Sequence, residues 1–265
     1  MAGQIPEERR LAIAEAVRLQ PLVRADELAG RLRVSIETVR RDLIALERDG
    51  LLRRVYGGAK GVSPRSFEPP VTERRRRNHA AKQAMGALAA ALLRPGDTAI
   101  LDVGTSVTET ARQLPWNHQG RVLTNSLPVA AELDGRDGIE VLISGGRVRQ
   151  GDMAVSGAQT AQFFAEYYAD KAFLGSGGVH PQAGLTDYYP DEAAVRRVIL
   201  DHAEESYVLA DASKIGHIAL CRVCGLERVT AVITDSRIEP RWHDQLRDAG
   251  LTVLVAGIHE HRAAG

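Results

Sequence analysis

Ser35-Ile36-Glu37-Thr38-Val39-Arg40-Arg41-Asp42-Leu43-Ile44-Ala45-Leu46-Glu47-Arg48-Asp49-Gly50 is the stretch that decides the fold of the first part of this chain. At a helical period its apolar residues fall on one side, and several polar residues face away. The apolar side consists of Ile36, Val39, Leu43 and Leu46. The opposite side holds Glu37, Thr38 and Arg41, flanked by Arg40. The pattern predicts an amphipathic helix with one face packed and the other free to contact a partner.

The ends of this helix are marked by residues that favour helix termini. Ser35 is a good N-cap, because its hydroxyl can accept a hydrogen bond from a backbone N–H of the first turn. Gly50 is a good C-terminal stop, because glycine adopts the left-handed conformation that ends many helices. We therefore expect a short helix bounded by Ser35 and Gly50.

Two further helical stripes precede it. The first contains Leu11, Ile13, Ala14 and Val17 and is ended by Pro21. The second spans residues 25–32, with Leu28 and Leu32 pointing inward. Only Arg33 and Val34 separate Leu32 from Ser35. Helices joined by so short a turn cross steeply, as in a helix-turn-helix motif.

In a helix-turn-helix the second helix enters the DNA major groove with its N-terminal residues at the base edges. The predicted contact residues are Ser35, Glu37, Thr38, Arg40 and Arg41. Arginine can bind guanine or phosphate bidentately, a glutamate can accept from cytosine, and hydroxyls can bind phosphates. The alternative is a solvated amphipathic helix with ordinary surface charges, which an isolated Arg-Arg-Asp tripeptide would favour.

A basic hairpin is predicted directly after this helix. Leu51 to Val55 is compatible with a β-strand, and Tyr56-Gly57-Gly58 is compatible with a turn. We interpret the segment as a wing that rests on the DNA backbone. Its predicted contact residues are Arg53, Arg54, Tyr56 and Gly57. Two helices, a turn, a capped helix and a basic hairpin in this order are hard to obtain by chance.

These residues resemble the N-terminal module of the DeoR family of bacterial transcriptional regulators. The family pattern is a Val-Ser turn, then T-[IV]-R-R-D-L-x-x-L-E-x-x-G and a basic Gly-Gly-Ala wing. The matching residues are Val34-Ser35, Thr38 to Leu43, Leu46-Glu47, Gly50 and Gly57-Gly58-Ala59. Tyr56 departs from the histidine common in the family, although tyrosine can also hydrogen-bond a phosphate.

Charge divides the chain into two parts. The whole sequence is neutral, with 34 Lys and Arg against 34 Asp and Glu, yet residues 1–82 carry a net charge of +7 and residues 83–265 a net charge of −7. The first part is therefore the one suited to phosphate. Ser63 to Pro70 is rich in proline and breaks any regular pattern, so the linker is expected there. The predicted division is a DNA-binding domain at 1–60, a linker at 61–78 and a sensing domain at 79–265.

The other sequence features predict a cytosolic protein without a metal or a cofactor. No apolar run is long enough to span a membrane, so we expect a cytoplasmic location. Cys221 and Cys224 form a CxxC without a second ligand pair, so we expect them to pack as small hydrophobic residues, and we predict no metal and no cofactor. Arg74 to Arg77 is either an interdomain segment or a contact to the DNA backbone.

After residue 82, short apolar runs end in small polar clusters and are followed by helical stretches. This alternation predicts an α/β domain with an open, mostly parallel sheet covered by helices. The polar clusters are residues 104–106, 124–126, 144–146, 175–178, 211–214 and 234–235. Since parallel strands end at the same edge of a sheet, and ligands of open α/β sheets bind outside that edge, we expect the clusters to line one crevice.

The residue types in these clusters suit a phosphorylated sugar. Gly104-Thr105-Ser106 can bind a phosphate at a helix start, and Lys214 can close on the phosphate as a point charge. Side chains such as Asn125 can take sugar hydroxyls. The full predicted set is Asp102, Gly104, Thr105, Ser106, Thr124, Asn125, Gly145, Gly146, Gly177, Asp211 and Lys214. For any single cluster a simple turn is the better interpretation, whereas several converging clusters favour a pocket.

From about residue 73 the chain also resembles the DeoR-type sensor domain, which is similar to ribose-5-phosphate isomerase. The matching segments are 102–106, 124–126, 144–146, 211–216 and 233–235. The resemblance implies binding of a phosphorylated sugar or a related intermediate. Ser106 stands where the family usually has threonine, and Arg196 and Arg197 stand where a lysine is expected.

Together these features predict a DNA-binding regulator that is not an enzyme, and the resemblance favours a repressor of carbohydrate-metabolism genes released by a sugar phosphate. The expected partners are operator DNA, that effector and further copies of the chain, because helix-turn-helix proteins usually bind paired half-sites. The alternative is a sugar-phosphate isomerase with a DNA-binding appendage, using Asp102, Asp187, Asp211 or Lys214 as acid, base or electrophile. The sequence supplies no assembled acid/base motif for that reaction.

Overall fold

The computed structural model describes residues 6–20, 22–48, 51–61, 65 and 67–257. The chain divides into two compact units, residues 1–70 and residues 71–265. Each unit has its own hydrophobic core, so each is described by itself. None of the described helices combines the length and the apolar composition needed to cross a membrane.

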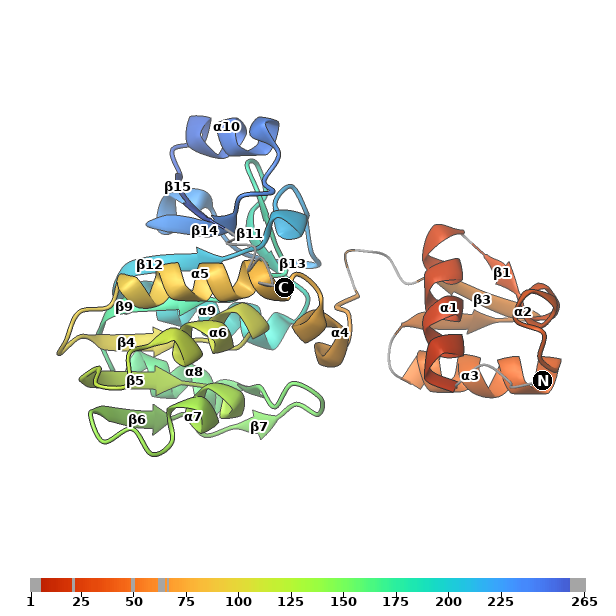
Figure 1. Ribbon diagram of the computed structural model, residues 1–265, viewed down its shortest axis with the longest axis horizontal. Helices are drawn as coiled ribbons and strands as arrows, with labels where there is room; N and C mark the ends of the chain where they lie inside the picture. The colour runs from red at the N-terminus through yellow and green to blue at the C-terminus, as the bar shows by residue number, and fades with distance from the viewer. Residues whose placement is uncertain (1–5, 21, 49–50, 62–64, 66, 258–265) are drawn as a thin grey trace, which may run out of the picture. The chain divides into compact units, whose positions relative to one another are not determined.

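The first unit packs three helices on a small antiparallel sheet of strand order β1-β3-β2 (Figure 1). Its elements are α1 (Pro6–Leu19), β1 (Val23–Arg24), α2 (Ala25–Leu32), α3 (Ile36–Arg48), β2 (Leu52–Val55) and β3 (Gly58–Gly61). Ile13, Leu28, Val39 and Leu43 are at the centre of the core. This is a winged helix-turn-helix, with α2 and α3 as the two helices and β2–β3 as the wing.

Two residues assigned to packed faces lie on the surface instead. Ile36 is 43% exposed and Leu11 is 55% exposed, so these two assignments were wrong. Ile36 is the first residue of α3 and lies between exposed Ser35 and Glu37, whereas the buried face of the helix begins at Val39. The predicted stop at Gly50 lies outside the described residues.

The second unit is built on a seven-stranded, fully parallel sheet of order β15-β14-β12-β9-β4-β5-β6 (Figure 1). The strands are β4 (Thr98–Leu101), β5 (Gly120–Thr124), β6 (Ile139–Ile143), β9 (Ala169–Leu174), β12 (Ala203–Leu209), β14 (Ala231–Asp235) and β15 (Thr252–Ala256). Both faces are covered, because β4 sends Ile100 into one core cluster and Ala99 and Leu101 into the other. The predicted α/β class is confirmed.

Helices form a layer on each face of this sheet. The helices on one face are α5 (His79–Ala91), α6 (Thr105–Gln113) and α7 (Leu127–Leu133), and those whose apolar residues join the other cluster are α8 (Ala158–Ala165), α9 (Pro190–Asp201) and α10 (Pro240–Asp248). A short helix, α4 (Val71–Arg76), opens the unit. It falls within the interval predicted as a linker.

Several smaller elements lie outside the seven-stranded sheet. An antiparallel sheet has the order β10-β11-β13, with β10 (Gly178–His180), β11 (Gly184–Asp187) and β13 (Cys221–Cys224). A two-stranded ladder joins β7 (Arg147–Val148) to β8 (Val155–Ser156). Short 3₁₀ turns occur at Ala212–Lys214 and Leu226–Arg228. The two small sheets are separate from the seven-stranded sheet.

Candidate functional site

Helix α3 presents a polar face at its N-terminal half. Glu37, Arg40 and Arg41 are exposed, and Glu37 lies 3.9 Å from each of the two guanidinium groups. Ion pairs at this distance between solvated side chains are weak, so the arginines can exchange Glu37 for another partner. The structure therefore leaves both arginines accessible to DNA.

The turn before α3 is held by backbone and side-chain hydrogen bonds. Arg33 has a left-handed φ of 53°, and the N–H groups of Arg33 and Val34 donate to the carbonyls of Gly30 and Ala29, which is a Schellman motif. The N–H of Thr38 donates to the Ser35 Oγ at 3.1 Å, which confirms Ser35 as the N-cap of α3. The Ser35 and Thr38 hydroxyls also lie 2.9 Å apart. Both hydroxyls therefore shape the start of α3 as well as lying near its open face.

Asp42 fixes the angle between α3 and α1. Its carboxylate is 2% exposed and accepts from Arg9 Nε at 2.5 Å and from Arg10 Nε at 3.1 Å. This role of Asp42 is not visible in the sequence, because the partner arginines are more than thirty residues away. The aspartate of the Arg-Arg-Asp motif orients the helix, and the two arginines before it face solvent.

The predicted wing residues surround the β2–β3 turn. Tyr56 is fully exposed, and Gly57 has a left-handed φ of 79°, as a tight turn requires. Arg53 is exposed, whereas Arg54 is bonded through Nε to the Glu47 carboxylate at 2.6 Å. Arg54 therefore positions the wing against α3, and its exposed part remains available to a phosphate.

In the second unit the carboxyl ends of the parallel strands bring the predicted polar clusters to one edge. The cluster after β4 is adjacent to those after β5 and β9, and the clusters after β6, β12 and β14 continue the same edge. Gly104, with φ of 142°, lies so close to Gly175 that a Cβ on it would be 3.6 Å from the Gly175 Cα. The loops after β4 and β9 therefore meet.

Helix α6 begins at this edge without a side-chain cap. Gly104 is its N-cap and no side-chain hydrogen bond caps it, so the first N–H groups, those of Thr105 and Ser106, have no intrahelical acceptor. Unpaired N–H groups and the helix dipole favour an anion at such a terminus. Thr105 is partly exposed and Ser106 is buried.

Two buried side-chain oxygens at the ends of β5 and β6 have no hydrogen-bond partner among the described residues. They are Asn125 Oδ1 and Ser144 Oγ. Asn125 donates through Nδ2 to the Val155 carbonyl at 3.2 Å, which leaves the oxygen side of the amide unsatisfied. Buried polar atoms of this kind are costly unless a ligand or water satisfies them. By contrast, Thr124 is satisfied, because its Oγ1 donates to the Leu101 carbonyl and accepts from Ser126 N.

Asp102 lies in a buried ion-pair cluster around Arg196. Its Oδ2 accepts from Arg196 Nε at 2.6 Å and from Gly175 N at 3.1 Å, and Arg196 also pairs with Asp187 and Glu192. Burial alone would lower the pKa of Arg196, but the three carboxylates outweigh burial and raise it. Arg196, which stands where a lysine was expected, ties the ends of β4 and β11 to α9.

Asp211 and Lys214 are joined to neighbouring loops. Asp211 is 4% exposed and accepts from Ser213 N, Ser213 Oγ and Asn78 Nδ2. The Lys214 ammonium donates to the Ser176 carbonyl, next to the loop of Gly104 and Gly175. The Lys214 ammonium is thus bonded to the loop after β9, whose Gly175 contacts Gly104 at the start of α6.

The three remaining glycines of the predicted set differ in their surroundings. A Cβ on Gly146 would lie 2.5 Å from Thr160 Oγ1, and one on Gly177 would lie 2.9 Å from the Asp187 Cα. Gly145 has open space around it, and its carbonyl accepts from Thr160 Oγ1. Gly146 and Gly177 are therefore required by packing, whereas Gly145 is open toward the edge.

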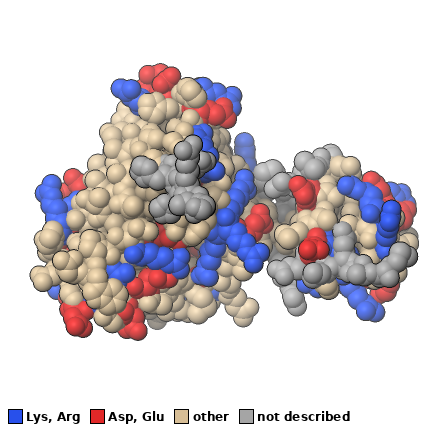
Figure 2. Space-filling model, viewed as in Figure 1, with Lys and Arg blue, Asp and Glu red and all other residues tan. Residues whose placement is uncertain are grey.

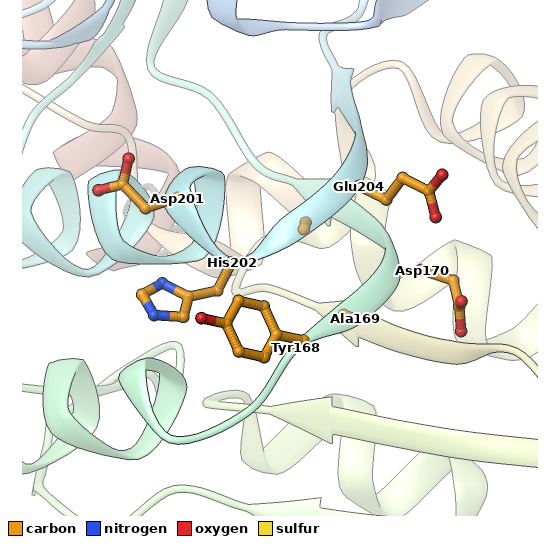
Figure 3. Close-up of a pocket in the computed structure, with 7 residues that line it drawn as sticks. Tyr168, Ala169, Asp170, Asp201, His202 and Glu204 are labelled. Atoms are coloured by element: carbon orange, nitrogen blue, oxygen red, sulfur yellow. The ribbon is translucent and has the colours of Figure 1, made fainter.

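A shallow cavity of about 340 Å³ lies at the opposite edge, where β9 and β12 begin (Figure 3). Its lining includes Asp170, Asp201 and Glu204, and the Tyr168 ring stands beside the His202 imidazole with centroids 5.3 Å apart. An acidic lining does not fit an anionic sugar phosphate. No residue of the predicted site lines this cavity.

The two cysteines lie on strand β13. Cys224 is buried and Cys221 is partly buried. Burial raises the pKa of Cys224 to about 11, so its thiol is protonated at neutral pH. This geometry agrees with packing as small hydrophobic residues.

Each of the two units matches a known protein domain. Residues 9–65 match the DeoR-like helix-turn-helix domain, and residues 77–236 match the DeoR C terminal sensor domain. The chain belongs to the DeoR family. Within that family it is a DNA-binding transcriptional regulator, with α1 to β3 in the helix-turn-helix match and α5 to β14 in the sensor match.

Relatives in the DeoR family match along nearly the whole chain. A candidate repressor of the aga operon in Escherichia coli O157:H7 is 33% identical over 253 residues, covering 94% of each chain. The HTH-type transcriptional repressor GlcR of Bacillus subtilis strain 168 is 29% identical over 249 residues, covering 94% of this chain and 96% of GlcR. Ribose 5-phosphate isomerase A from Methanocaldococcus jannaschii is similar at 19% identity and a TM-score of 0.39, over 52% of this chain and 54% of the isomerase.

Proposed function

We propose that this DeoR-family regulator represses carbohydrate-metabolism genes by binding an operator, and that a phosphorylated sugar bound at the carboxyl edge of the second unit relieves repression. Two observations support the effector half: the N-terminus of α6, which follows β4, has no side-chain cap, and Asn125 Oδ1, at the end of the neighbouring strand β5, is unsatisfied. The N-terminus of α6 suits a phosphate, and Asn125 Oδ1 can accept a hydrogen bond from a sugar hydroxyl. The names of the relatives, an aga operon repressor and GlcR, support repression over activation.

In the DNA half, α3 enters the major groove and Arg40 and Arg41 reach bases or phosphates. The wing residues Arg53 and Tyr56 contact the DNA backbone next to that groove. Helix-turn-helix proteins usually bind two half-sites as dimers, so we propose that the protein acts as a homo-oligomer.

In the effector half, the N–H groups of Thr105 and Ser106 bind the phosphate, and Lys214 exchanges the Ser176 carbonyl for a phosphate oxygen. Asn125 accepts from a sugar hydroxyl. The predicted contributions of Asp102 and Thr124 are indirect, because their side-chain atoms hold the loops that carry these groups.

We further propose that the protein is not an isomerase. An isomerase requires a carboxylate base close to the carbon that loses the proton. Asp102 and Asp187 are both bonded to Arg196, and Asp211 is bonded to Ser213 and Asn78. Turnover of a pentose or hexose phosphate that disappears in Asp211→Ala would overturn this part of the proposal.

The direct test is a gel shift on the DNA upstream of the protein's own gene with a panel of pentose and hexose phosphates. We expect at least one sugar phosphate to release the DNA from the wild-type protein. Lys214→Ala should still bind the DNA but respond only at higher concentrations of the same compound. A wild-type protein that binds the DNA and ignores the whole panel would contradict the effector half.

A further inference from the structure

Lys82 is a buried lysine that neither the sequence-based prediction nor the proposed function uses. It lies in the first turns of α5 and is 4% exposed. Its ammonium donates to the Arg74 carbonyl at 2.7 Å and to the Arg77 carbonyl. Arg74 lies in the last turn of α4 and Arg77 directly follows the helix, so neither carbonyl accepts from an N–H group of α4 itself. Lys82 therefore holds the end of α4 against α5.

Helix α4 is also bonded to the carboxyl edge of the sheet. Arg74 pairs with Asp152 at 3.1 Å, between β7 and β8. Asn78 donates to Asp211 Oδ1 at 3.0 Å and accepts from Arg237 at 2.9 Å. In Figure 1 the arrowheads of β4, β5 and β6 point to the side of the unit on which α4 lies. The segment that follows residue 70, the end of the first unit, is thus fixed to the edge that carries the effector residues.

The surroundings of Lys82 are rich in cations. The carboxylate that acts most strongly on the Lys82 ammonium is that of Asp211, which also accepts from Ser213 and Asn78. Burial lowers the pKa of Lys82 to about 8, Asp211 acts in the opposite direction, and Lys214, Arg74 and Arg77 lower the pKa further. Figure 2 shows Lys and Arg side chains gathered over α4. A buried ammonium in such an environment is stabilised by an anion.

We propose that Lys82 is an effector-binding residue that accepts the anionic group of the effector and thereby fixes α4. Its ammonium has three N–H donors, and two of them are directed at α4 carbonyls. An anion between Lys82 and Lys214 takes the third, neutralises the cationic surroundings and strengthens the bonds to α4. This inference rests on the proposed function, because it deepens how the same site acts on the segment leading to the DNA-binding unit.

A merely structural role for Lys82 makes a different prediction. If the ammonium only capped α4, its removal would change the protection of α4 amides equally with and without anion, and would leave anion affinity unchanged. An effector-binding role links the two quantities, so both must be measured on the same variants.

The test combines calorimetric titration with inorganic phosphate and hydrogen exchange of residues 71–77, on the full chain. The variants are Lys82→Met, which removes the charge and the donors, and Lys82→Gln, which keeps amide donors without the charge. Arg75→Ala is the control, since Arg75 is an exposed cation of α4. Near-ultraviolet circular dichroism and thermal melting establish that each variant is folded.

In the wild type and in Arg75→Ala, phosphate should bind and should slow exchange in residues 71–77. In both Lys82 variants the Kd for phosphate should rise about tenfold or more. Phosphate should also no longer slow amide hydrogen exchange in α4. Wild-type affinity in both variants, or no phosphate binding by the wild type, would overturn the inference. If sugar phosphates still release DNA in that case, the proposed function stands and only the role of Lys82 is refuted.

Discussion

At the scale of single residues, two arginines show how environment assigns roles to one side-chain type. Arg41 is exposed on α3 with only a distant pairing to Glu37, whereas Arg196 is buried among three carboxylates. A guanidinium that is fully paired inside the protein holds elements together. One that is exposed beside a free helix face can bind DNA.

Replacing Arg41 tests the DNA-binding face. If Arg41 reaches a base edge, Arg41→Ala should weaken operator binding by about 1 to 3 kcal/mol and leave sugar-phosphate affinity nearly intact. Fluorescence anisotropy with labelled operator DNA measures the first quantity, and calorimetry measures the second. Arg241→Ala, at an exposed arginine of α10, is the matched control and should bind the operator like the wild type. Unchanged operator affinity in Arg41→Ala would exclude Arg41 from the interface.

The titration of Lys82 predicts a pH dependence of stability. Burial is the main reason why the pKa of Lys82 falls from 10.5 to about 8. The Asp211 carboxylate raises this pKa, whereas the nearby cations Lys214, Arg74 and Arg77 lower it. Between these two values the unfolded chain holds a proton that the folded protein has lost, so this group makes the folded state more stable as pH rises. The effect is at most about 3 kcal/mol, from 1.36 kcal/mol per pKa unit.

The measurement compares the free energy of unfolding of the wild type and of Lys82→Met by urea titration at pH 7 and at pH 9.5. The wild type should gain stability relative to Lys82→Met as the pH rises. A constant difference between the two proteins would mean that the pKa of Lys82 is not lowered in the folded state.

At the scale of elements, the start of α6 depends on a glycine. Gly104 has φ of 142° and ψ of 149°, a region that side chains rarely adopt. Gly104→Ala should therefore cost about 1 to 3 kcal/mol of stability and displace the N–H groups of Thr105 and Ser106, with a loss of sugar-phosphate affinity.

Thermal unfolding and calorimetric titration of the full chain check this expectation. Gly30→Ala is the control, because Gly30 lies in α2 with open space at its Cβ position, and this change should be neutral or slightly stabilising. A Gly104→Ala protein with wild-type stability and affinity would show that the start of α6 is neither strained nor part of the site.

Local chemistry made some elements predictable. The bounds 25–32 for α2 and the Ser35 cap of α3 agree with the structure, since each depends on neighbouring residues in the sequence. Ile36 was assigned to the wrong face, because periodicity does not show where the packed region of a helix begins. The β10-β11-β13 sheet was missed, since it pairs β11 with a strand more than thirty residues later.

The candidate site was predictable in its types of residue but not in its contacts. Strand-end clusters such as Gly104-Thr105-Ser106 are visible in the sequence, and the parallel sheet brings them to one edge. The partners of Asp102 and Lys82 are not visible. Arg196 is distant in the sequence, and the burial of Lys82 depends on the chain turning back at Asn78, a non-glycine residue with a left-handed φ of 56°.

At the scale of the whole molecule, the proposed function requires that two sites on one chain be coupled. An effector that weakens operator binding must itself be bound more weakly by the operator complex, and by the same factor. Coupling of this kind is typically about 1 to 3 kcal/mol, or roughly 5- to 150-fold in affinity.

The measurement that tests this central claim most directly is an anisotropy titration of operator DNA at increasing concentrations of the sugar phosphate that is active in the gel shift. A calorimetric titration of the same sugar phosphate into free and operator-bound protein accompanies it. The account predicts that the operator Kd rises with sugar phosphate to a plateau, and that operator DNA raises the sugar-phosphate Kd by the same factor. An operator Kd that stays constant at saturating sugar phosphate would contradict it.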